Sequence, residues 1–339
     1  MRPVGLTIGH GYAKAVSGGR MTRFPAVAAL ARETGYESAI GHGPAVIQLN
    51  DLGEWIVGDD ALTFAPQRLV SILDRTRYTN PSFIALARQA LVQVVPDPGS
   101  LSIMTGMPAA WYADTPARAA LEAAVRAAAA PWGDVVVRIA PEAAGVYCAY
   151  VFETGVLNRA RVQGAIGVID AGYRDINVAY FKDGRYVAGE SVAGGIADAL
   201  RQIKRLIAAA YGLELALHEV DAAVRANGVH VAGIRCPLPA GSLEALHAGL
   251  DTIIATGRSL WPNGGKTLDA LVLGGGGAVL LGPAIRAMFA QTVVPSADLR
   301  EAQTPDDIRD RIARADPQLA GARGFAAAAA AATAAHVDP

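Results

Sequence analysis

The eleven residues LTIGHGYAKAV (6–16) decide the fold of this chain of 339 residues. Their apolar positions predict a β-strand, after which Gly9, His10 and Gly11 form a tight turn before a second strand that carries Lys14. Glycines at such a turn let backbone N–H groups approach phosphate oxygens, and the lysine adds positive charge nearby. The stretch therefore predicts either a phosphate-binding turn or a hairpin with a purely structural role.

The same pattern returns about 160 residues later, in VIDAGYRDINV (168–178). When the two segments are superposed, Thr7 falls on Asp170 and Gly9 falls on Gly172. An aspartate at the end of an apolar strand, exposed by a glycine turn, is typical of an acid that holds a metal ion through water or orients a group in a cleft. A turn aspartate without further function is the alternative interpretation. The chain therefore contains one hairpin motif twice.

Strands and helices alternate along both halves, which favours a layered α/β fold. Because the hairpin motif is duplicated, we expect two similar domains, each with a mixed sheet flanked by helices, around a central cleft where a ligand binds. The first domain is expected over residues 1–162 and the second over residues 163–316. The C-terminal segment 317–339, with a helix from about Pro317 to His336, is expected to complete the first domain.

Two further segments carry candidate chemistry. Glu142, in IAPEAAGVY (139–147), stands where a strand gives way to a helix and is a candidate for a general base or a water-orienting group. The alternative is an acid that only favours the helix dipole. Gly274 to Gly277 follow the strand DALVL and would let a base or phosphate lie against bare backbone, or would simply form a tight turn. These glycines do not fit the dinucleotide-binding fingerprint.

Composition excludes several classes of protein. Apolar residues make up 52% of the chain and the formal net charge is −1, so we expect a sizeable interior and no direct nucleic-acid binding. Cys148 and Cys236 lie far apart, which fits a reduced cytosol. The N-terminus lacks a secretory signal, and the alanine tract near the C-terminus is too short and too weakly apolar to cross a bilayer. We therefore expect a cytoplasmic protein without a membrane span.

The order of these motifs resembles that of the actin-like ATPase superfamily, and most closely that of bacterial plasmid-segregation actins of the ParM type. The resemblance runs through nearly the whole chain. The segments that carry it are GLTIGHGYAKAV (5–16), WIVGDDAL (55–62), IMTGMPAAWY (103–112), APEAAGVY (140–147), GVIDAGYRDINVAYF (167–181), LVLGGGGAVLL (271–281) and DPQLAGARGFAAAA (316–329). It implies a duplicated actin-like, ribonuclease H-like fold with a central nucleotide cleft.

The resemblance also implies ATP or ADP and Mg²⁺ as ligands, and a role for each candidate residue. Asp170 would lie near the magnesium ion, holding it through water, and Glu142 would orient the attacking water. The residues implied to bind the nucleotide are Thr7, Gly9, His10, Gly11 and Lys14 of the first half, and Gly172, Tyr173, Lys204, Gly274, Gly275 and Gly276 of the second. Lys204 would act from a helix that covers the base.

One position departs from the family, whose members carry aspartate where Thr7 stands. A hydroxyl in its place is expected to slow hydrolysis or loosen the metal. The implied function is a filament-forming, slow ATPase in plasmid or DNA segregation, or a cytoskeletal scaffold, with further copies of itself and a possible DNA-binding adaptor as partners. The alternative is a sugar or acid kinase of the same superfamily, although no distinct catalytic base is evident in the sequence.

Overall fold

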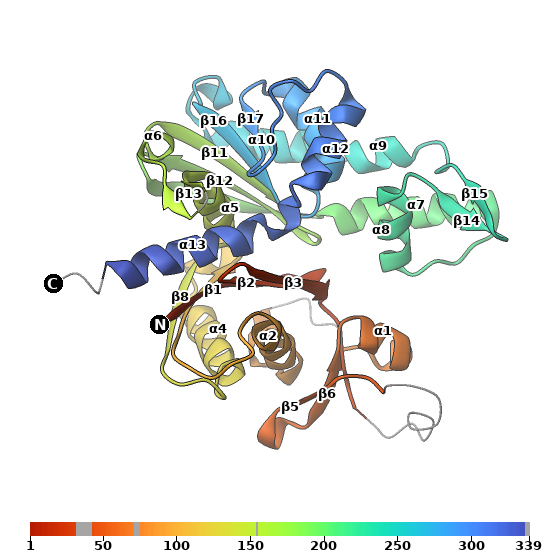
Figure 1. Ribbon diagram of the computed structural model, residues 1–339. Coiled ribbons are helices and arrows are strands. Elements are labelled where there is room, and N and C mark those ends of the chain that lie inside the picture. The colour runs from red at the N-terminus through yellow and green to blue at the C-terminus, as the bar shows by residue number, and fades with distance from the viewer. Residues whose placement is uncertain (32–42, 71–74, 154, 336–339) are drawn as a thin grey trace. The chain divides into compact units, whose positions relative to one another are not determined.

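The computed structural model describes residues 1–31, 43–70, 75–153 and 155–335. The chain divides into two compact units, drawn in Figure 1. Unit 1 comprises residues 1–158 together with 319–339, and unit 2 comprises residues 159–318. His336, the expected last residue of the terminal helix, lies outside the described residues.

Unit 1 is built on a five-stranded mixed sheet in the order β3-β2-β1-β7-β8. The first three strands pair in antiparallel fashion, and β7 and β8 continue the sheet in parallel. The strands are β1 (Arg2–Ile8), β2 (Tyr12–Ser17), β3 (Arg20–Pro25), β7 (Leu101–Met107) and β8 (Val135–Pro141).

Smaller strands and several helices complete the described part of unit 1. The small strands are β4 (Ala28–Leu30), β5 (Val46–Gln48), β6 (Glu54–Val57), β9 (Phe152–Glu153) and β10 (Val156–Leu157). The helices are α1 (Asp59–Phe64), α2 (Pro81–Val94), α3 (Ala109–Tyr112), α4 (Thr115–Ala128), α5 (Glu142–Val151) and α13 (Ala320–Ala334). Helix α1 is preceded by Gly58, which makes no side-chain cap hydrogen bond, and Asp60 of its first turn accepts from the Ala45 N–H.

The alanine-rich helix α13 closes one face of the unit 1 sheet through very small residues. A Cβ at Gly5 of β1 would collide with the backbone of Ala322, and one at Gly324 would collide with the backbone of Gly145 in α5. The small side chains of both elements therefore allow near-contact of their backbones, as at close-packed helix interfaces. On the other face, Val4, Leu6 and Ile8 belong to the core that includes α2 and α4.

Unit 2 repeats the sheet of unit 1, in the order β13-β12-β11-β16-β17 and with the same strand directions. The duplicated architecture predicted from the two hairpins is confirmed. The sheet strands are β11 (Ala165–Ala171), β12 (Asp175–Lys182), β13 (Arg185–Ala193), β16 (Ala270–Gly274) and β17 (Thr292–Val293), with a separate hairpin of β14 (Val229–Val231) and β15 (Ile234–Cys236). The helices are α6 (Arg159–Val162), α7 (Ile196–Tyr211), α8 (Leu217–Arg225), α9 (Ser242–His247), α10 (Leu250–Leu260), α11 (Ala278–Met288) and α12 (Pro305–Arg314).

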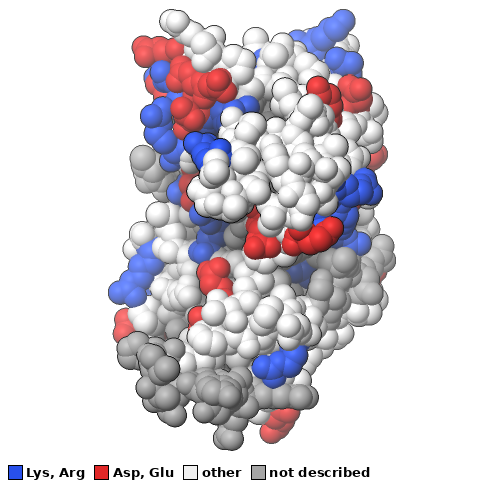
Figure 2. Space-filling view, turned by 90° about the vertical axis from the view of Figure 1, so that its right-hand side faces the viewer, with Lys and Arg blue, Asp and Glu red and all other residues white. Residues whose placement is uncertain are grey.

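The surface of the protein carries charges of both signs. On the face shown in Figure 2, acidic and basic side chains are interspersed among uncharged atoms, as a formal net charge of −1 leads one to expect. Among the described residues, no helix is both long enough and apolar enough to cross a membrane.

Candidate functional site: two hairpins and a glycine loop

In unit 1 the first hairpin turns at Gly9, His10 and Gly11, as predicted. The Gly9 N–H donates to the Tyr12 carbonyl over 3.0 Å and closes the turn. Thr7 pairs with Lys14 across the two strands, so their side chains lie on the same face of the sheet. The five unit 1 residues predicted to contact nucleotide are thus gathered at one hairpin end.

The Thr7 hydroxyl is the unusual atom of this hairpin. Its Oγ1 is buried and has no hydrogen-bond partner among the described residues. Thr7 faces Gly321 of α13, and a Cβ added to that glycine would lie 3.8 Å from the threonine methyl group. Leaving a buried hydroxyl unsatisfied costs about 1–3 kcal/mol, so this oxygen is suited to a ligand or water that would complete its bonding.

Arg77 supports the same turn, although the sequence analysis did not single it out. It belongs to a 3₁₀ helix at Arg75–Thr79, and only 6% of its surface is exposed. Its Nη2 donates to the Ile8 carbonyl at 2.8 Å and to the Gly9 carbonyl at 3.2 Å, while Nη1 lies 3.1 Å from Nε2 of His10. A contact between residues almost 70 positions apart leaves no local pattern by which sequence reasoning could find it.

Glu142 is the first residue of α5, directly after strand β8, as predicted. Gly106 at the end of β7 lies against it, since a Cβ there would come within 3.0 Å of its Cα and 3.1 Å of its Cγ. Farther along α5, burial raises the pKa of the Cys148 thiol to about 12, so this cysteine is not a thiolate nucleophile at neutral pH.

In unit 2 the second hairpin brings Asp170 beside the glycine loop. Asp170 ends strand β11 and is paired in parallel register with Gly274 of β16. Gly275 has φ of +83°, and a Cβ on it would lie 2.5 Å from both the Asp170 Oδ1 and the Ala171 carbonyl. Only glycine fits here, because both the backbone conformation and the space exclude a side chain. Two segments predicted separately from the sequence therefore meet in one place.

The loop of the second hairpin is held by the N-terminus of α7. The N–H groups of Gly195, Ile196 and Ala197 donate to the carbonyls of Arg174, Gly172 and Tyr173 over 2.6, 3.3 and 2.7 Å. Gly172 also needs its small size, since a Cβ would collide with the Asp175 carbonyl. Main-chain groups thus fix the conformation of this loop.

The last glycines of the loop contact α8 rather than the predicted lysine of α7. Nη2 of Arg225 donates to the Gly276 carbonyl over 3.2 Å, and its Nε bonds to the buried carboxylate of Asp221. Lys204 instead lies 3.7 Å from the carboxylate of Glu214. Arg225 of α8, which the sequence analysis did not single out, therefore lies at this loop, and the role of Lys204 stays a prediction.

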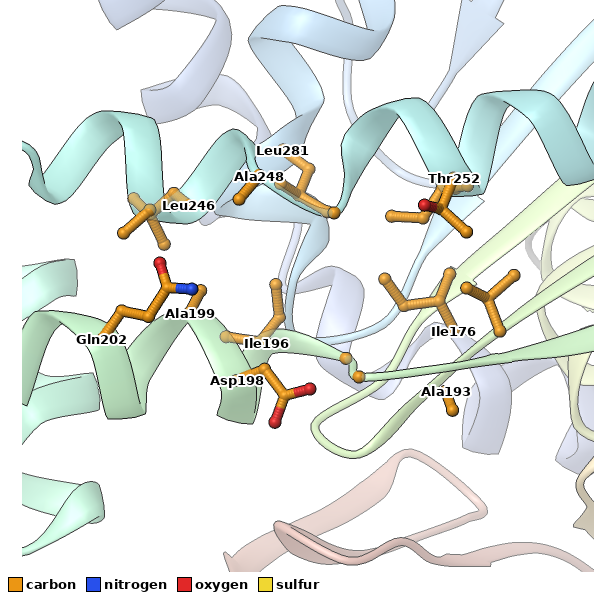
Figure 3. A pocket seen from close by; sticks show the side chains of 16 residues that line it. Ile176, Ala193, Ile196, Asp198, Ala199, Gln202, Leu246, Ala248, Thr252 and Leu281 are labelled. Atoms are coloured by element: carbon orange, nitrogen blue, oxygen red, sulfur yellow. The ribbon is translucent and has the colours of Figure 1, made fainter.

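Unit 2 also contains a cavity of about 250 Å³, which lies between α7, the α9–α10 turn and the end of β13 (Figure 3). Its lining combines apolar side chains, among them Ile176, Ile196 and Leu246, with the polar side chains of Asp198, Gln202 and Thr252. None of the residues predicted to bind nucleotide lines it. The cavity is therefore separate from the predicted site residues.

The chemistry of these groups fits a phosphate ligand and a hard cation. The described residues contain no cluster of three or more His, Cys, Asp or Glu side chains able to hold a metal ion on their own. Magnesium usually keeps several waters and binds through one or two carboxylates plus the substrate's phosphates. In unit 2, Asp170 is a carboxylate of this kind beside the glycine loop.

Comparison with known proteins agrees with the duplicated architecture. Residues 5–132 match the family described as the N-terminal domain of actin-like proteins. Among curated proteins, none matches the chain by sequence.

Solved structures match over the whole chain. An archaeal actin homologue, Ta0583, is 20% identical with a TM-score of 0.71, covering 98% of this chain and 100% of its own. The same homologue in complex with ADP has a TM-score of 0.70 at 20% identity and the same coverage. A subunit of a 15-stranded ParM filament from Clostridium botulinum is 14% identical with a TM-score of 0.73, covering 97% of this chain and 99% of its own. At these identities the matches establish the fold.

Proposed function

We propose that this chain, which has an actin-like N-terminal domain and the actin fold, is an actin-like protein that binds ATP and ADP and assembles into filaments. The observation that carries the proposal is the repeated hairpin. Each unit presents a glycine turn at the end of its first sheet strand, and in unit 2 that turn lies against a second glycine loop.

In this proposal the phosphates are bound by the turn at Gly9–Gly11 with Lys14 and by the turn at Gly172. Glycine turns suit this task because the backbone N–H groups can reach phosphate oxygens without a side chain in between. The adenosine would lie against Gly274–Gly276, where Arg225 adds a cation beside the loop. An ADP complex of the structurally similar archaeal actin homologue supports this choice of ligand.

We further propose slow hydrolysis of ATP. Magnesium, when bound, neutralises charge on the phosphates. Asp170 would hold its water shell, and Glu142 would orient the attacking water for in-line displacement. Thr7 offers a neutral hydroxyl where the family has a second carboxylate, so turnover would be slow and the ATP-bound state long-lived.

Assembly would be head-to-tail, since a heterologous contact whose rotation does not close generates an open filament. The structurally similar ParM protein that forms a 15-stranded filament supports this part of the proposal. The physiological role would be segregation of a plasmid or other DNA through an adaptor, or a scaffold in the cytoplasm. The near-neutral charge makes an adaptor a better link to DNA than direct binding.

The proposal is tested by combining assembly and turnover on the same protein. Light scattering, sedimentation and negative-stain microscopy are measured with ATP, ADP and no nucleotide, each with magnesium, alongside phosphate release. We expect nucleotide-dependent filaments and slow phosphate release. A chain that remains monomeric at high concentration with ATP and magnesium would refute the filament, and absence of nucleotide binding would refute the ligand.

A further inference from the structure

The first phosphate turn depends on a buried cation that lies outside it in sequence. The Arg77 guanidinium reaches the carbonyls of Ile8 and Gly9 and the ring of His10. Its charge lies near the rings of Phe83 and Tyr78, with Cζ 5.4 and 5.8 Å from their centroids. An arginine donates from a rigid planar fork, so it can fix several acceptors at once.

Arg77 is itself held in place by the start of α2. Its carbonyl accepts the Asn80 N–H over 3.2 Å, and the Asn80 side chain caps the helix by accepting from the Ser82 N–H at 2.9 Å. Helix α2 packs on the sheet through buried side chains such as Phe83 and Leu91. The backbone of Arg77 is therefore fixed to a helix that packs in the core.

The geometry of the peptide bond converts this contact into a direction for the turn. In a planar trans peptide the C=O and the following N–H point to opposite sides. When Arg77 fixes the Gly9 carbonyl toward itself, the His10 N–H of the same peptide is directed away from the arginine. The turn is thereby set with an N–H on its other side, as an anion-binding backbone nest requires.

The charge adds to this orientation. The guanidinium is almost fully removed from water, where screening is weak, and it lies directly behind the turn. A guanidinium can only donate, and its Nη1 lies 3.3 Å from Nδ1 and 3.1 Å from Nε2 of His10. An anion in front of the turn would meet a positive potential that the loop residues alone do not supply.

We propose that Arg77 is a positioning residue that sets the first turn for the nucleotide phosphates and supplies charge behind it. The proposal rests on the proposed nucleotide binding and names the part of the ligand that Arg77 serves. Arg77 would act on phosphate through the loop, without touching the nucleoside. Its removal should therefore weaken the binding of ADP and ATP but leave the binding of adenosine unchanged.

The test compares Arg77→Met, Arg77→Lys and Arg88→Met with the unaltered protein. Dissociation constants for ATP, ADP and adenosine are measured by calorimetry with magnesium, and folding is checked by circular dichroism. Arg88 is the matched control, because it also bonds to two main-chain carbonyls of unit 1, those of Ala127 and Ala128 at the end of α4. Met and Lys keep most of the aliphatic stem of the arginine side chain.

We expect Arg77→Met to weaken ADP and ATP on the order of 10- to 100-fold, the range for losing a charge-assisted hydrogen bond, with adenosine changed less than about twofold. Arg77→Lys keeps the charge without the fork and should fall in between, and it also serves if the methionine variant does not fold. Arg88→Met should bind all three ligands normally.

Two outcomes overturn the inference while leaving nucleotide binding intact. A folded Arg77→Met that binds ADP as tightly as the unaltered protein would show that the turn needs no support. An equal loss of ADP and adenosine would indicate a general structural role. If the unaltered protein binds none of the three ligands, the proposed function itself fails, and the inference falls with it.

Discussion

The two hairpins occupy the same place in two sheets of the same strand order, yet their loops are supported in different ways. In unit 2 the carbonyls of the loop accept hydrogen bonds from main-chain amides at the start of α7. In unit 1 the carbonyls of Ile8 and Gly9 accept from the Arg77 side chain. Duplication of the fold therefore conserves the hairpin but not its support. The unit 2 loop is held by main-chain amides at a helix start where Gly195 leaves no room for a side chain, and the unit 1 loop is held in addition by the side chain of one arginine.

The two units also differ in the residue next to the end of the first strand of each hairpin, in β1 and in β11. Asp170 presents a carboxylate beside Gly275, whereas Thr7 presents a buried hydroxyl without a partner among the described residues. A carboxylate can hold a hydrated cation, and a hydroxyl can offer only a neutral hydrogen bond. If the unit 2 hairpin takes part in hydrolysis and the unit 1 hairpin mainly binds phosphate, substitutions in the two hairpins should have unequal effects on phosphate release.

The largest effect is expected from Asp170→Ala. Removing the carboxylate should lower the rate of phosphate release by at least about 100-fold, as for other groups that stabilise or orient charge in a transition state. The control is Asp269→Ala, which removes a carboxylate that accepts from the Ala165 N–H at the opposite end of the same strand. Phosphate release is measured for both with ATP and magnesium.

Asp269→Ala should lower stability while folded protein keeps its turnover. If Asp170→Ala retained full phosphate release, the unit 2 hairpin would not be the chemical one, and the contrast between the hairpins would have to be reversed.

The next effect is expected from Gly275→Val, compared with Gly212→Val. Both glycines have left-handed backbones, with φ of +83° and +67°, so both variants carry similar strain. Only Gly275 is crowded, by the Asp170 carboxylate and the Ala171 carbonyl, since nothing lies within 4 Å of a Cβ at Gly212. We expect Gly275→Val to weaken ADP roughly 10- to 100-fold, because overpacking costs about 1–3 kcal/mol and displaces Asp170.

Titration with a fluorescent ADP analogue measures this difference, with thermal unfolding as the check on stability. Equal losses of affinity in the two variants would attribute the effect to backbone strain alone. In that case the glycine loop and Asp170 would not form one site.

A smaller effect, in the opposite direction, is expected from Thr7→Asp, which makes the two hairpins alike. A second carboxylate would add a charge-assisted hydrogen bond to the metal's water shell, a gain of order 1–2 kcal/mol over the hydroxyl. We expect phosphate release to rise about 5- to 30-fold and filament lifetime to shorten. Single-turnover phosphate release, with Thr22→Asp on the neighbouring strand β3 as a charge control, measures the rate. An unchanged rate would mean that the missing acid does not limit turnover.

The architecture could be read from the sequence because its signals are local. Each hairpin is encoded within about a dozen residues, and the glycines of 274–277 follow directly on an apolar strand. The structure confirms the duplicated fold and brings Asp170 to Gly275, as the order of motifs implied. Even the alanine tract was interpretable, since a helix of small residues is suited to the close packing of α13 on Gly5 and Gly145.

The support of the site could not be read in this way, because it depends on contacts between distant segments. Arg77 lies between residues that show no motif, and only the fold brings it to Ile8 and Gly9. The same holds for Arg225, which lies 51 residues before the loop it contacts, while Lys204 had the more suggestive position in the sequence. The roles assigned to the individual site residues stay predictions, which the variants above address.

The smallest effect is expected from Thr7→Val, which sharpens the comparison by removing only the hydroxyl. Valine has nearly the same shape and suits a β-strand equally well, so packing against α13 should be kept. In the absence of ligand the Oγ1 has no partner among the described residues, and its removal should therefore raise the free energy of unfolding by about 1 kcal/mol.

With ligand the sign reverses. If the hydroxyl bonds to the nucleotide or its hydration shell, Thr7→Val should weaken ADP by about 2- to 10-fold, the range for one neutral hydrogen bond. Thermal unfolding with and without ADP and magnesium measures both the stability of the free protein and its stabilisation by ADP. The control for the substitution itself is Thr105→Val, at a buried threonine of β7. A variant that is less stable without ligand would show that the hydroxyl already has a structural partner. One that is more stable without ligand but binds ADP unchanged would remove Thr7 from the site and leave phosphate binding in unit 1 to the turn and Lys14.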